Sequence, residues 1–112
     1  MELKDTIEMM NSTDYKERFK AEYWQTKIRY EKLKDFNTKI EAARHLQYFA
    51  EVRSGLQMPP HESPDLLLTE QQNIMGQYLH TLEVRAEIEG IALYQMDYPV
   101  KEEEKHERKN LC

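Results

Sequence analysis

The sequence predicts an all-α fold in which two long helical arms form a hairpin around one turn. Residues 1–54 contain neither glycine nor proline. Glycine and proline, which both break helices, then occur together in residues 55–64, and no further proline follows until Pro99. Helix-forming residues on both sides of one cluster of breakers favour two arms and one turn. Because two arms have little interior of their own, we expect oligomerisation to complete the core.

A short N-terminal helix and a long first arm are predicted before the turn. Leu3, Ile7 and Met10 recur at helical spacing. Asp14 followed by Glu17 is typical of a capping box that begins the next helix. Apolar and polar side chains then follow a seven-residue seam, the pattern of helices packed side by side, at Phe19, Tyr23, Thr26, Tyr30, Leu33 and Asn37. Residues 38–54 continue the helical pattern, and propensity leaves open whether a bend precedes them.

The second arm is predicted to begin at Ser63 as the cap, with Pro64 at the first helical position. Gly55 is a natural stop for the first arm. Gly76 and Gly90 interrupt the second arm, and each marks either a close helix crossing or the helix end. The residues expected to be buried on this arm are Leu68, Met75, Leu79, Leu82 and Ala86, flanked by Leu67, Ile74 and Tyr78.

The chain is expected to hold one helical domain, residues 1–98, and a charge-mixed, disordered tail, residues 99–112. Its one cysteine, Cys112, has no intrachain partner. The sequence shows no signal peptide and no apolar stretch long enough to span a bilayer. These features predict a soluble protein of a reducing cytosol, without a membrane partner.

The distribution of charge argues against nucleic-acid binding. Residues 1–53 hold 11 basic and 10 acidic residues, whereas residues 54–100 hold seven acidic residues and one basic residue, Arg85. No basic face emerges that could follow a phosphate backbone.

Catalytic and metal-binding patterns are weak. His80 and Glu83 form an H-x-x-E pair that supplies two metal ligands at most, fewer than a stable site needs. Glu83, Glu87 and Glu89 lack the second carboxylate-bearing helix that all-helical nucleotide pyrophosphohydrolases use to hold magnesium. We therefore expect no enzyme activity, no cofactor and no metal.

Arginine and aromatic side chains form the best candidate ligand site. Guanidinium forks suit phosphate oxygens, and aromatic faces suit a purine ring. The predicted ligand-binding residues are Arg18, Tyr23, Trp24, Gln25 and Arg29 on the first arm with Tyr78 and Arg85 on the second. In the alternative interpretation, Arg85 pairs with Glu22 or Glu31 across the hairpin and only fixes the register of the helices.

Two stretches carry a resemblance to a known group of proteins. One is the run from Asp14 to Gln25; the other spans Met75 to Ile91 and includes Tyr78, Arg85 and Glu89. Together they resemble a family of small helical proteins from phages and prophages of Gram-positive bacteria, over about residues 1–93, with a departure at residues 38–54. Proteins of this style are similar in build to the sponges that oligomerise and enclose a nucleotide immune signal without altering it.

The resemblance implies a homo-oligomeric anti-defence protein in the cytoplasm of a bacterial host. Its ligand would be an ADP-ribose derivative or a cyclic nucleotide, sequestered without chemistry. Arg18, Arg29 and Arg85 would grip phosphates, Tyr23, Trp24 or Tyr78 would stack the base, and Gln25 would read an edge. The alternative is an interaction protein whose acidic second arm blocks a host defence enzyme or nuclease. A structural role in the virion also stays open.

Overall fold

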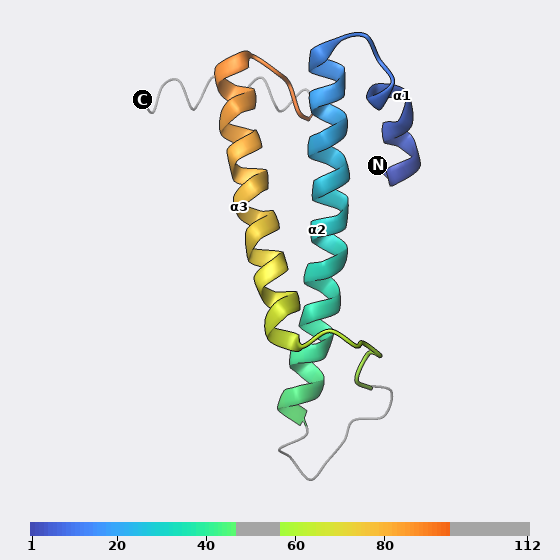
Figure 1. The fold of residues 1–112 in the computed structure, drawn as a ribbon, viewed down its shortest axis with the longest axis vertical. Helices are drawn as coiled ribbons and strands as arrows, with labels where there is room; N and C mark the ends of the chain where they lie inside the picture. The colour runs from blue at the N-terminus through green and yellow to red at the C-terminus, as the bar shows by residue number, and fades with distance from the viewer. Residues whose placement is uncertain (47–56, 95–112) are drawn as a thin grey trace.

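The computed structural model describes residues 1–46 and 57–94, and this part of the chain is helical without a β-strand. A 3-10 turn, η1 (Leu3–Thr6), runs into the short helix α1 (Ile7–Met10). The long helices are α2 (Tyr15–Leu46) and α3 (Asp65–Glu89). They run antiparallel, side by side, and α1 lies on the opposite side of α2 from α3 (Figure 1). The predicted all-α hairpin with a short leading helix is therefore confirmed.

Both long helices begin close to the predicted residues, but the capping contacts differ. The Asp14 carboxylate accepts the Lys16 backbone N–H at 3.0 Å, as an N-cap should. The Asp14 backbone N–H donates to Ser12 Oγ at 3.0 Å rather than to Glu17, so the predicted reciprocal box is incomplete.

The start of α3 is displaced by one residue from the prediction. Pro64 occupies the N-cap in place of Ser63, and its carbonyl accepts the backbone N–H groups of Leu67 at 3.0 Å and Leu68 at 3.2 Å. Proline serves there because the N-cap residue contributes its carbonyl to the helix, while its missing N–H is outside the helical ladder.

The two glycines of the second arm have different roles. Gly90 ends α3 in the left-handed region with φ 69°, and its N–H donates to the Ala86 carbonyl. Gly76 lies inside α3, where a Cβ atom would stand 3.4 Å from Tyr30 Cε1. The close crossing and the helix end are thus both present, one at each glycine.

The apolar core lies between the upper parts of α2 and α3 in Figure 1. It consists of Phe19, Tyr23, Leu79, Leu82, Ala86, Ile91 and Leu93, with Trp24 and Tyr30 packed against it. Three of the five predicted α3 core residues are buried, whereas Leu68 and Met75 are only partly buried. Ile91 and Leu93 join the core because the chain turns back over the helices after Gly90.

Helix α2 continues through residues 38–46 as one helix. The predicted helical residues 47–54, the stop at Gly55 and the domain boundary at residues 98–99 lie outside the described residues. In residues 1–46 and 57–94, no helix combines the length and apolar character needed to cross a membrane.

Candidate functional site

The contact between the two long helices changes character about halfway along. In the upper half, residues 15–30 of α2 face residues 76–89 of α3 across the apolar core. In the lower half, residues 31–46 of α2 and residues 65–75 of α3 add polar contacts between the helices, although Ile40 and Ala43 are buried there. The predicted ligand residues lie in the upper half, so we describe that half first.

Tyr23 and Trp24 are built into a packed aromatic corner. The buried Tyr23 hydroxyl donates to Glu83 Oε2 at 2.7 Å and lies 3.0 Å from the Tyr94 hydroxyl. Trp24 Nε1 donates to the Leu93 carbonyl at 2.9 Å, and the Trp24 ring stands edge-on to those of Tyr23 and Tyr94. Burial, followed by the hydrogen bonds to Tyr94 and Glu83, raises the pKa of Tyr23. In this arrangement both aromatic residues bind the end of α3 to α2.

Arg85 joins α3 to the first turn of α2. Its Nη2 donates to the Tyr15 hydroxyl at 2.7 Å, its Nε donates to Glu89 Oε2 at 3.2 Å, and its guanidinium carbon lies 5.0 Å from the centre of the Phe19 ring. A cation over an aromatic ring adds to these hydrogen bonds. Arg85 therefore contacts α2 across the hairpin through Tyr15 and the Phe19 ring, rather than through an ion pair with Glu22 or Glu31, while Glu89 is its neighbour on α3 itself.

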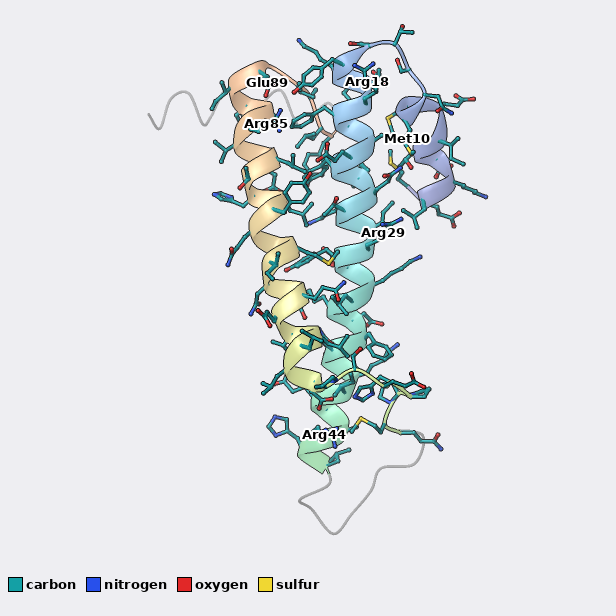
Figure 2. All side chains as sticks on the ribbon, viewed as in Figure 1. Met10, Arg18, Arg29, Arg44, Arg85 and Glu89 are labelled. Atoms are coloured by element: carbon teal, nitrogen blue, oxygen red, sulfur yellow. The ribbon has the colours of Figure 1, made fainter. Side chains whose placement is uncertain are left out.

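The other predicted residues are spread over separate faces. Arg18 Nη1 donates to the Ser12 carbonyl at 2.9 Å, and Gln25 Nε2 donates to Thr6 Oγ1 at 3.0 Å and to Met10 Sδ. Arg29 is exposed on the side of α2 turned away from α3 (Figure 2).

Tyr78 is 41% exposed on α3. The structure thus brings Tyr23 and Trp24 together and leaves Arg29 apart from Arg85 (Figure 2). A ligand role for the seven residues stays a prediction.

The lower half contains a hollow that the sequence interpretation did not identify. Its volume is about 470 Å³. Basic, acidic, amide and hydroxyl side chains and one isoleucine from both helices line it: Lys34, Asn37, Thr38, Ile40, Glu41, Arg44, His45, Asp65, Thr69, Gln72 and Asn73. A wider, more open hollow of about 720 Å³ adjoins it, sharing Gln72 and Asn73 and extending past Tyr30 and Gly76 to His80.

One amide pair joins the two helices beside the hollow. Asn37 Nδ2 donates to Gln72 Oε1 at 2.9 Å and to the Leu68 carbonyl at 3.1 Å. Amide side chains in the seam replace the apolar contacts of the upper half, and each amide carries both donors and acceptors. The polar seam therefore leaves hydrogen-bonding groups available along the hollow.

Two residues that line the hollow, Arg44 and Asp65, form an ionic cluster with His61. Asp65 accepts from Arg44 Nε at 2.8 Å, and its other oxygen lies 2.6 Å from His61 Nε2. The hydrogen bonds from Arg44 and then from His61 lower the pKa of Asp65 to about 2. The hydrogen bond from His61 Nδ1 to the Pro59 carbonyl, and then the contact with Asp65, raise the pKa of His61. Asp65 is therefore an ionised structural group near neutral pH.

Lys34 and Arg44 both bring a positive charge to the hollow, but Arg44 forms an ion pair with Asp65. Among residues 1–46 and 57–94, no acidic group lies within ion-pair distance of the Lys34 ammonium. Lys27 and Lys39, by contrast, pair with Glu31 at 3.3 Å and Asp35 at 3.0 Å along α2. Lys34 is thus the cation of the hollow best placed to meet an anionic ligand.

A sequence signal for the hollow existed in the interruption of the apolar seam. Asn37 falls at the last position of a seam that is aromatic or apolar except at Thr26, and Gln72 faces it. Two amides that face each other at such a contact favour a polar opening. Only the structure shows that Asn37 pairs with Gln72, which is 35 residues away in the sequence.

The described part of the chain does not contain three or more His, Cys, Asp or Glu side chains grouped as metal ligands. His80 and Glu83 lie 3.9 Å apart as the predicted surface pair.

Comparison with known proteins places the chain in a family. A family model described as Sequestin matches residues 13–88, more than half of the chain, and the chain therefore belongs to the Sequestin family. The match begins just before α2 and ends one residue before the end of α3, so it covers both halves of the hairpin. No curated protein and no solved structure matches the chain.

Proposed function

We propose that this Sequestin-family chain binds and sequesters a nucleotide immune signal, an ADP-ribose derivative or a cyclic nucleotide, and does so for a phage against a bacterial defence. The family name denotes sequestration, which supports binding without chemistry. The observation that carries the proposal is the polar hollow of about 470 Å³ between the lower halves of α2 and α3. Ligand pockets of this kind measure about 300–1,000 Å³.

The lining suits a molecule that has both phosphate and base or ribose groups. Lys34 provides an ammonium point charge for a phosphate oxygen. Thr38, Gln72 and Asn73 provide hydroxyl and amide groups that both donate and accept, as base edges and ribose hydroxyls require. Tyr30 borders the wider hollow and offers an aromatic face to a base.

The proposed binding site is therefore in the lower half of the hairpin, whereas the ligand residues predicted from sequence lie in the upper half. The Tyr23 hydroxyl and the Trp24 indole N–H are used in intrachain hydrogen bonds, and Arg85 uses its Nε and Nη2 groups in the same way. A base could stack on Tyr23 or Trp24 only after the packed corner at Tyr94 opened. Arg29, exposed on the far side of α2, remains the predicted residue best placed to bind from solution.

A retention experiment tests the function. Purified protein is mixed with a panel of ADP-ribose derivatives and cyclic nucleotides, filtered, and heat-denatured, and both fractions are analysed by mass spectrometry. We expect one class to be missing from the filtrate and to be released intact on heating. Conversion to a product would show an enzyme, and full recovery of every nucleotide in the filtrate would contradict sequestration.

Matched variants locate the site once a ligand is retained. Lys34→Gln and Asn73→Ala should each weaken binding about tenfold or more, because a hydrogen bond to a charged group contributes about 1.5–3 kcal/mol and each 1.4 kcal/mol is tenfold. Lys39→Gln and Gln71→Ala are the controls on the same helices outside the hollow. Loss with Arg29→Gln and none with Lys34→Gln would favour the predicted site over the hollow.

A further inference from the structure

Helix α3 carries a second row of mostly apolar side chains outside the core that it forms with α2. Leu67, Ile74, Thr81 and Ile88 recur every seven residues along it, and Tyr78 lies beside them; we call these five residues the outer stripe. Ile88 is 78% exposed, Ile74 57% and Leu67 54%, whereas Leu79 and Leu82 on the α2-facing side are buried. From Leu67 to Ile88 the stripe spans about 30 Å at the helical rise per residue.

A row of this length differs from scattered surface hydrophobes. Single exposed apolar residues are ordinary, but a periodic, contiguous patch marks an interaction surface. A seven-residue repeat is the pattern by which one helix packs along another. The occupant of the stripe should therefore be a helix.

We propose that the occupant is α3 of a second copy of this chain, packed antiparallel about a two-fold axis that passes between Gln77 and Tyr78. In that arrangement Leu67 of one copy lies level with Ile88 of the other, and Ile74 lies level with Thr81. The four positions of the seven-residue repeat then meet one another, and Tyr78 lies level with Gln77 of the second copy. A two-fold interface requires this kind of self-complementarity.

Charge selects the antiparallel direction. The same axis places Glu70 level with Arg85 of the second copy, the only basic residue of α3. Arg85 keeps 46% of its side chain exposed beside its contacts with Tyr15 and Glu89, and a guanidinium has five N–H donors. Parallel packing would instead set Glu70 against Glu70 and Arg85 against Arg85. Like charges facing each other disfavour that direction.

The dimer would also affect the wider hollow. Gln77 and Thr81 line that hollow, and they lie at or beside the two-fold axis. The second copy would therefore stand along the open side of the hollow in each protomer. Any effect of the dimer on ligand binding rests on the proposed function. The dimer itself does not depend on that function, and it is tested with protein that holds no nucleotide.

Sedimentation equilibrium of the full chain over a range of concentrations tests the dimer. We expect the wild-type protein to dimerise, and Ile74→Glu to raise the dimer dissociation constant at least about a hundredfold, because the two-fold axis places the substitution in the interface twice. Leu66→Glu is the matched control: Leu66 is 85% exposed on α3 but outside the stripe, so its variant should dimerise like wild type. Circular dichroism confirms that both variants stay helical.

Cross-linking tests the direction, in a Cys112→Ser background that removes the native thiol. The double variant Leu67→Cys with Ile88→Cys should join two chains through a short thiol cross-linker, whereas Leu67→Cys alone should not, because antiparallel packing holds the two copies of residue 67 far apart. A monomer at every concentration, or a dimer unaffected by Ile74→Glu, would overturn the proposal. Efficient cross-linking of Leu67→Cys alone would overturn the antiparallel arrangement. A monomer whose stripe binds a host protein would replace the second copy with that partner.

Discussion

The upper and lower halves of the hairpin use the same two helices in opposite ways. In the upper half, Tyr23 and Leu82 are fully buried and the contact is apolar. In the lower half, Asn37 bonds to Gln72 and Arg44 bonds to Asp65 across a hollow. Apolar burial supplies most folding free energy, while polar seams contribute little net stability and leave groups for a ligand. The comparison indicates that the upper half holds most of the apolar core, and the lower half contains the hollow where we propose that the ligand binds.

Leucine truncation at equivalent positions should give the largest difference between the halves. Leu82→Ala should lower the free energy of unfolding by about 2–5 kcal/mol, because it leaves a cavity in a closed core. Leu68→Ala, two seven-residue repeats earlier on the same face of α3, should cost about 1 kcal/mol, since Leu68 is only partly buried. Urea unfolding of both variants measures this. Equal losses would show that the lower half carries as much of the core as the upper.

The hydroxyl of Tyr23 should have a smaller effect on the upper half. Tyr23→Phe removes the hydrogen bond to Glu83 and the contact with Tyr94, and should cost about 1–2 kcal/mol in the free energy of unfolding. Tyr78→Phe, at an exposed position, is the control and should be near neutral. The same variant bears on the predicted site. If Tyr23→Phe keeps its stability but loses nucleotide retention, the Tyr23 hydroxyl acts on a ligand and not on packing.

Gly76 lies at the junction of the two halves, and Gly90 ends the upper half. Substitution by alanine should therefore change the free energy of unfolding in opposite directions at the two glycines. Gly90→Ala should destabilise by about 1–2 kcal/mol, because φ 69° is unfavourable for a residue with a Cβ atom. Gly76→Ala should stabilise by less than about 1 kcal/mol, because the gain in helix propensity is offset by contact with Tyr30. Thermal unfolding of the two variants measures both signs. A larger loss of stability at Gly76 than at Gly90 would show that Tyr30 cannot shift to accommodate a Cβ atom at the helix crossing.

The upper half was also the easier one to predict from sequence. The clustered helix breakers located the hairpin, and the regular repeat that contains Phe19 and Tyr23 located the helix faces, while each glycine was left open between a crossing and a helix end. The repeat does not show which side chains contact each other across the folded chain. The chain turns back at Gly90 and brings Leu93 and Tyr94 onto Trp24, so a residue predicted to stack on a ligand also packs within the chain.

The lower half escaped prediction for a related reason. Arg44 and His61 belong to separate segments, and Asp65 brings them together only in the folded chain. A single sequence gives the face on which each side chain lies but not its partner across the turn. For this reason the residue types of the hollow were visible while the hollow itself was not.

The ionic cluster of the lower half should give the smallest effect, one that depends on pH. His61 has a folded-state pKa above its ordinary value of 6.5, so its contact with Asp65 contributes fully below pH 6.5 and is lost as pH rises through the folded-state pKa. Asp65 has its pKa lowered from 3.8 to about 2, so its contribution is present above about pH 4 and is lost as pH falls toward 2. The cluster should therefore be strongest between about pH 4 and 6.5.

Urea unfolding of wild type and His61→Gln at pH 5.5 and pH 8.5 measures this effect. The difference in the free energy of unfolding between the two proteins should be larger at pH 5.5, where His61 is charged against Asp65. His80→Gln, which removes a histidine that is 78% exposed, should show no comparable change in that difference. Because the cluster lies beside the hollow and not in the apolar core, the loss above pH 7 should leave the upper half folded. Cooperative loss of the whole hairpin at pH 8.5 would mean that the two halves are a single unit of stability, and the division between holding the fold and binding would then be wrong.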